Sequence, residues 1–132
     1  MSMNKTKHGE TIVPKGAFPE RHELNTAWFL NDIGKDVEFL VPADKNHIKT
    51  PDIKMEGIFW EIKAPKGNSK YTFQHAFKEA LRQSQNIIFD LRRNSMPEDN
   101  CINKLKKEFS LSKSIKYLLI ITKSKKLLDF KK

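Results

Sequence analysis

Two carboxylates and a lysine lie close together in the stretch PDIKMEGIFWEIK, residues 51–63. The Glu-Gly dipeptide at 56–57 predicts a two-residue β-turn, because glycine accepts the positive φ that tight hairpins need. With that turn, Asp52 lies directly opposite Glu61 on the neighbouring strand, and Lys63 shares their face. Like charges that oppose each other in this way repel. The pattern therefore predicts a cation site on this hairpin.

The same register gives the hairpin an apolar reverse face, typical of a strand pair that covers a core. This face carries Ile53, Met55, Ile58, Trp60 and Ile62. The polar face has a simpler alternative explanation, in which its carboxylates form surface ion pairs with Lys54 and Lys63. Exposed pairs of that kind contribute little to stability. Phe59 is the one aromatic residue of the polar face that can meet a substrate, unless the following helix covers it.

A third acid precedes the hairpin. Residues 20–33 repeat apolar side chains at helical spacing, with Gly34 as a stop, and Glu23 lies on or beside the apolar stripe of this predicted helix. Its alternative role is a favourable charge near the positive end of the helix dipole. Residues 36–42 alternate and predict a strand. We expect Trp28 and Trp60 in the core, and the isolated His47 and His75 at the surface.

The rest of the chain alternates between helices and apolar strands. A helix follows Thr72, its predicted N-cap, and continues to about residue 85. Short apolar runs at 87–91 and 117–122 predict buried strands, and 96–109 predicts a helix between them. Apolar strands joined by helices favour parallel pairing. The expected class is α/β, with a mixed central sheet flanked by helices.

Bulk composition restricts the kind of protein. With 132 residues we expect one domain at 20–132 after an N-terminal arm at 1–19. A single cysteine excludes an internal disulfide framework and a multi-cysteine zinc site. No apolar run is long enough to predict a membrane span or a signal peptide.

The charge balance points to an anionic partner. The formal net charge is +9 and the isoelectric point is near 9.7, which favours nucleic acid. From Asn103 to the end there are ten lysines and only two acidic residues. A second set of candidate nucleic-acid contacts flanks the hairpin and comprises Lys66, Lys70, Lys78, Arg82, Gln83 and Arg92.

The acidic pair, the following lysine and the order of elements resemble the PD-(D/E)xK nuclease superfamily, over roughly residues 20–93. The resemblance implies a core of order αβββαβ, here extended by a C-terminal helix and strand. It implies that Asp52, Glu61 and the backbone carbonyl of Ile62 bind Mg²⁺ or Mn²⁺, or Zn²⁺, with Glu23 joining directly or through water. Lys63 would orient the attacking water or neutralise the phosphate.

More narrowly, the runs WEIKAPKGNSK and QSQNIIFDLRR are similar to the C-terminal toxin domains of CdiA proteins of contact-dependent growth inhibition. That resemblance implies an endonuclease toxin that cleaves RNA, with tRNA favoured over DNA, after delivery into the cytoplasm of a neighbouring bacterium. It also implies a cognate immunity protein, which we expect to be acidic. Three alternatives stay open: a DNA endonuclease of the same superfamily, a metal-independent RNase, and a nucleic-acid-binding module without catalysis.

Overall fold

The computed structural model describes residues 8–43 and 50–132, and His47 lies outside these ranges. Within them the chain has seven strands and three helices, as expected for a mixed α/β protein. It divides into two compact units, of which the first ends at Phe59 and the second runs from Trp60 to Lys132. No helix in these ranges has both the length and the apolar character that a bilayer crossing requires.

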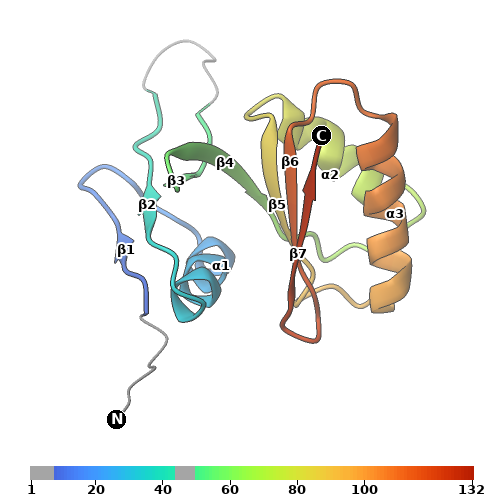
Figure 1. Ribbon diagram of the computed structural model, residues 1–132, viewed down its shortest axis with the longest axis horizontal. Coiled ribbons are helices and arrows are strands. Elements are labelled where there is room, and N and C mark those ends of the chain that lie inside the picture. Colours follow the sequence, from blue (N-terminus) through green and yellow to red (C-terminus); the bar gives the residue numbers. More distant parts are fainter. Residues whose placement is uncertain (1–7, 44–49) are drawn as a thin grey trace. The chain divides into compact units, whose positions relative to one another are not determined.

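The first unit combines one helix with three short strands (Figure 1). These are β1 (Thr11–Ile12), α1 (Arg21–Asp32), β2 (Val37–Phe39) and β3 (Ile53–Met55). β2 pairs in parallel with β1 and antiparallel with β3. The core of this unit is made of apolar side chains that are nearly inaccessible to solvent: Ala27, Leu30, Val37, Phe39, Ile53 and Met55.

α1 begins and ends where its sequence predicts. Glu20 is the N-cap, and Gly34 follows the C-terminus with a φ of 90°, a conformation that favours glycine. β1, however, lies in the stretch that we predicted as an arm. The Thr11 hydroxyl donates to Asn31 Oδ1, and the Gly9 N–H donates to the Asn31 carbonyl. A two-residue strand is too short to show a periodicity, so these long-range bonds were not visible in the sequence.

The prediction that Trp28 is a core residue is wrong. Its side chain is 44% exposed, and the guanidinium carbon of Arg21 lies 5.9 Å from the centroid of its ring. α1 instead buries Thr26, Ala27 and Leu30. Trp28 follows directly after this stripe, and a step of one residue turns a helix by about 100°, which is enough to bring a side chain to the surface. Trp60, in contrast, is buried as predicted, with 2% exposure.

The predicted turn of the hairpin is present. Glu56 and Gly57 both have positive φ, 55° and 76°, as a type I′ turn requires. The turn joins β3 to β4 (Ile58–Lys63). Asp52 belongs to the first unit and Glu61 to the second, so their predicted opposition stays a prediction.

The second unit continues with α2 (Thr72–Leu81), β5 (Asn86–Asp90), α3 (Glu98–Leu111), β6 (Tyr117–Ile121) and β7 (Leu127–Lys131). β4, β5 and β6 pair in parallel, which confirms the pairing expected for apolar strands joined by helices. β7 returns antiparallel to β6 and was not predicted. Its half-exposed, lysine-flanked pattern LLDFK lacks the apolar run that marked the other strands.

α2 and α3 pack on the same face of the strands β5 to β7 (Figure 1). The core on this face joins side chains of both helices to alternate residues of β5 and β6, among them Phe73, Phe77, Phe89, Leu105, Leu118 and Ile120. The strand register places Glu61 beside Ile87 and Lys63 beside Phe89. Because side chains of neighbouring strands share faces at these positions, Glu61 and Lys63 point toward the helices.

Two details of α2 differ from the prediction. Tyr71, not Thr72, is the N-cap. The Thr72 hydroxyl oxygen instead accepts a hydrogen bond from the Ser69 N–H, which closes the turn before the helix. The helix also ends at Leu81 rather than near residue 85, because Gln83 and Ser84 donate back to Ala80 in a tight turn that leads into β5.

Candidate active site

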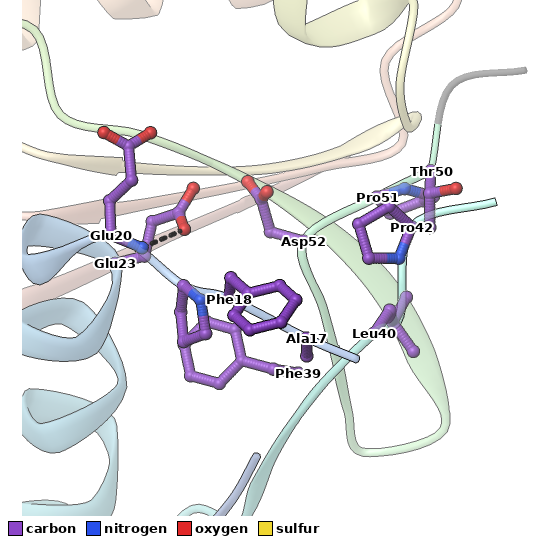
Figure 2. Close-up of a pocket in the computed structure, with 11 residues that line it drawn as sticks. Ala17, Phe18, Glu20, Glu23, Phe39, Leu40, Pro42, Thr50, Pro51 and Asp52 are labelled. Carbon is purple, nitrogen blue, oxygen red and sulfur yellow. Dashed lines mark hydrogen bonds between the residues drawn. The ribbon is translucent and has the colours of Figure 1, made fainter. Parts of the chain in front are cut away.

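Glu23 and Asp52 line one pocket of about 220 Å³ within the first unit. Asp52 directly precedes β3, and its carbonyl accepts a hydrogen bond of 3.0 Å from the N–H of Leu40, which continues the β2–β3 ladder. Figure 2 shows the carboxyl groups of Glu23 and Asp52 turned toward the same side of the pocket, with the rings of Phe18 and Phe39 below them. The structure therefore brings together two of the four predicted acidic and basic site residues in one place.

The environment of Glu23 disfavours its charged form. Burial raises the pKa of Glu23 to about 7, and the nearby carboxyl group of Asp52 acts in the same direction through its charge and through a side-chain hydrogen bond. A backbone hydrogen bond opposes this effect, because the N–H of Glu20 donates to Glu23 Oε1 at 2.9 Å. A partly buried carboxyl group beside a second carboxyl group is a favourable place for a divalent cation, because the cation offsets their mutual repulsion.

Two neighbours of Glu23 were not among the predicted site residues. Glu20, His22 and Glu23 each offer one ligand atom, and these atoms lie within 4.8 Å of one another. Glu20 also lines the pocket that contains Asp52. The signal in the sequence was the pair of glutamates three residues apart at a helix start, which also fits an ordinary capping box.

The raised pKa of Glu23 predicts how stability depends on pH. Between its ordinary pKa of 4.5 and about 7, the folded state keeps a proton on Glu23 that the unfolded chain has released. The contribution of Glu23 to the free energy of unfolding must then fall as pH rises through this window. We expect Glu23→Gln to remove that decrease. Urea unfolding of both proteins in EDTA, from about pH 4.5 to about pH 8, measures it, and identical pH profiles would contradict the assignment.

Glu61 and Lys63 form the polar part of the second unit's candidate site. Glu61 is buried, with 6% exposure, and its Oε2 lies 4.0 Å from Lys63 Nζ. Lys63 Nζ also forms a short ion pair with Oε1 of Glu79 on α2. Lys63 is thus held between an acid of its own strand and an acid of the covering helix. Glu79 was not predicted, because nothing in its spacing distinguishes it from a solvated helix residue.

The loop after Lys63 is held by residues of the connection between β5 and α3. The side-chain amide of Asn94, which is almost fully buried, donates to the carbonyls of Pro65 and Gly67 at 2.9 and 2.8 Å. Arg93 donates to the carbonyl of Ala64. These bonds fix the backbone that follows Lys63, so the side chain of Lys63 extends from a rigid end of β4.

For the nuclease activity expected from the sequence, Glu79→Ala should reduce turnover by about tenfold without changing KM, because Lys63 loses the partner that holds it in place. Glu79→Gln keeps an acceptor at the same position and should restore most of the rate. Steady-state kinetics on a labelled RNA, the substrate expected from the sequence, give kcat and KM separately. Asp99→Asn, at an exposed position in the first turn of α3, is the matched control. An unchanged kcat in Glu79→Ala would contradict this role.

The predicted nucleic-acid contacts divide into three groups. Lys70, Lys78 and Arg82 are exposed along α2 and its ends, and Lys66 is exposed on the loop before it. Arg92 is engaged with the buried Asp90 through bonds of 2.9 and 2.8 Å to its two carboxylate oxygens. The side chain of Gln83 turns its oxygen into the protein, where the described residues offer it no hydrogen bond.

Comparison with known proteins places the chain in a family. The sequence profile described as the contact-dependent growth inhibition CdiA C-terminal domain matches residues 49–127, which is more than half of the chain. The chain belongs to this family. The matched region contains Asp52, Glu61, Lys63 and the whole of α2, whereas Glu23 lies outside it.

A solved structure supports the fold of this CdiA C-terminal domain. It is a chain of the CdiA-CT/CdiI toxin and immunity complex from Burkholderia pseudomallei, with a TM-score of 0.69 and 18% sequence identity. The alignment covers 94% of the present chain and 100% of that chain. A search of curated proteins finds no match. The assignment to the PD-(D/E)xK superfamily stays a prediction.

Proposed function

We propose that this CdiA C-terminal domain is a metal-dependent endonuclease toxin that cleaves RNA, with tRNA as its favoured substrate. The observation that carries the proposal is the Glu23–Asp52 pair, in which burial and a second carboxyl group raise the pKa of Glu23 to about 7. Carboxyl groups with pKa values perturbed in this way cluster at functional sites, and a divalent cation bound between the two would relieve their mutual repulsion.

The donor atoms fit a hard cation. Glu23 and Asp52 supply carboxylate oxygens, with Glu20 and His22 adjacent. Oxygen ligands of this kind suit Mg²⁺ or Mn²⁺, and the imidazole of His22 makes Zn²⁺ a further candidate. When bound, such an ion supplies Lewis-acid stabilisation of phosphate charge and a water of lowered pKa. We further propose that Glu61 and the carbonyl of Ile62 complete the ligand set.

The chain's own residues have separate tasks in this mechanism. Lys63 holds an ammonium group ready to orient the attacking water or to neutralise a phosphate oxygen, and Glu61 and Glu79 keep it in one position. Glu23 can receive a proton near neutral pH, because its pKa lies near 7.

The basic surface supports a polyanionic substrate, although some of its lysines bond to the protein's own backbone. Of the ten C-terminal lysines, Lys123 donates to the carbonyls of Asn94 and Met96, and Lys132 donates to the carbonyl of Ser112. These two lysines therefore stabilise loops. The other eight C-terminal lysines should be tested one by one for contacts with phosphate groups.

A cognate immunity protein is the second proposed partner. The matched structure is described as a complex of a toxin with its immunity protein. We propose the same kind of partner here, with an acidic surface that complements a chain of net charge +9. The domain would act in the cytoplasm of the target cell, after delivery by the contact-dependent system to which its family belongs.

The direct test incubates the protein with total RNA, purified tRNA and plasmid DNA, each with Mg²⁺, Mn²⁺, Zn²⁺ or EDTA. We expect RNA cleavage with a divalent metal and no cleavage in EDTA. Cleavage that persists in EDTA would identify a metal-independent RNase, and cleavage of DNA alone would identify a DNase. Binding without any product would identify a nucleic-acid-binding module and reject the proposal.

A further inference from the structure

Two aromatic rings stack on the exposed surface of α2. The rings of Tyr71 and His75 have their centroids 6.0 Å apart and an interplanar angle of 24°. Tyr71 is 51% exposed, and His75 is exposed as well. The carbonyl of Tyr71 accepts the N–H of His75 at 3.0 Å, so the first turn of the helix fixes the spacing of the two side chains. We call these two residues the aromatic pair.

Cations surround the aromatic pair. Lys70 Nζ lies 5.5 Å from the centroid of the Tyr71 ring. Lys78 and Arg82 follow His75 by three and seven residues, so they continue the same face of the helix and its C-terminal end. On the other side, Lys70 and Tyr71 line a pocket of about 130 Å³ together with residues of α3 that include Lys104, Lys107 and Glu108.

The aromatic pair is connected to the candidate catalytic lysine through α2 itself. Glu79, which forms the ion pair with Lys63, follows His75 by four residues and therefore lies one turn further along an adjoining stripe. At 1.5 Å per residue, Tyr71 and Glu79 are separated by about 12 Å along the helix axis. A nucleic-acid strand that reaches Lys63 can thus extend over the aromatic pair within a few nucleotides.

We propose that Tyr71 and His75 form a stacking platform for an unpaired base of the RNA substrate. The proposal rests on the proposed function for the identity of the substrate. Exposed aromatic faces beside lysines and arginines are the arrangement that binds single-stranded nucleic acid, because the rings stack on bases while the cations contact phosphates. Five cations stand against one acid, Glu108, which has no ion pair among the described residues. This balance favours a polyanion such as nucleic acid over a neutral or basic peptide.

The test separates stacking from charge. In EDTA, fluorescence anisotropy measures the binding of an unstructured single-stranded RNA and of an RNA duplex of the same length. Tyr71→Ala should weaken binding of the single strand by about 5- to 150-fold, the range for loss of one base–aromatic stack. It should leave duplex binding within about twofold, because paired bases do not present a free face. Tyr71→Phe should keep both affinities, and Lys78→Ala should weaken both.

Trp28→Ala is the matched control. Trp28 is a half-exposed ring with a nearby cation on α1, yet it is not part of the aromatic pair. His75→Ala provides a second variant, and the urea midpoint of each variant confirms that it folds. Equal effects of Tyr71→Ala and Trp28→Ala, or equal losses for single strand and duplex, would overturn the platform.

The two proposals fail in different ways. If the unaltered protein cleaves RNA but Tyr71→Ala binds the single strand normally, the platform is wrong and the nuclease assignment is retained. If the unaltered protein cleaves nothing but loses single-strand affinity on Tyr71→Ala, the nuclease assignment is wrong and the platform is retained. An altered affinity of Tyr71→Ala for a purified immunity protein, with RNA binding unchanged, would assign the pair to a protein interface instead.

Discussion

Asp52→Asn is expected to lower the rate of RNA cleavage by about 10²- to 10⁴-fold, the range for loss of a catalytic proton-transfer or charge-stabilising group, because the proposed metal loses a carboxylate ligand. The substitution keeps the size of the side chain and removes the negative charge that lies next to Glu23. It should therefore also lower the pKa of Glu23, because one of the charges that raise it is gone. Single-turnover cleavage of labelled tRNA over a range of pH measures both effects.

Asp32→Asn is the matched control for this variant, since Asp32 is an exposed acid at the C-terminal end of the same unit's helix. Its rate should stay within about twofold of the unaltered protein. A rate for Asp52→Asn that equals the control would exclude Asp52 from the chemistry.

Lys63→Ala should be as damaging as Asp52→Asn, and the double variant tests whether the two residues serve one reaction. Groups that act as a unit are strongly non-additive, so the double variant should be scarcely slower than the slower single one. Additive losses would mean that Asp52 and Lys63 contribute to separate steps, which would contradict a shared catalytic centre.

Phe89→Ala is expected to reduce the free energy of unfolding by about 3–5 kcal/mol, the range for truncating a fully buried phenylalanine. Phe89 has no exposed surface, and its ring lies 6.1 and 6.0 Å from those of Phe73 and Phe77 on α2. Small domains are stable by only about 5–15 kcal/mol, so this single cavity removes a large share. Urea denaturation followed by circular dichroism measures the change.

Phe59→Ala is the comparison for Phe89→Ala, because the Phe59 side chain is 50% exposed. It should change the free energy of unfolding by no more than about 0.5 kcal/mol.

The local parts of this protein were determined by the sequence alone. The turn at Glu56 and Gly57 depends only on which residues accept positive φ, and α1 depends on an apolar stripe with a glycine stop. The parallel pairing of β5 with β6 follows from apolar strands joined by a helix. Each of these features is encoded within a few residues or within one connection, so each is readable without tertiary contacts.

Tertiary structure decided the features that join distant segments. β1 exists because it pairs with β2 and because Thr11 and Gly9 both bond to Asn31 near the end of α1. β7 exists because it returns onto β6. The exposure of Trp28 depends on which side of α1 faces the sheet. None of these relations leaves a periodicity in the sequence, because the partner of each residue lies in another element.

The chemistry of the candidate site divides in the same way. Residue type and spacing in the sequence predicted Glu23, Asp52, Glu61 and Lys63 as site residues. Only the folded chain shows that burial and Asp52 raise the pKa of Glu23, and that Glu79 holds Lys63 from α2. The physical reason is that a pKa or an ion pair depends on distances across space and on lost solvent, which neither residue type nor spacing along the chain specifies.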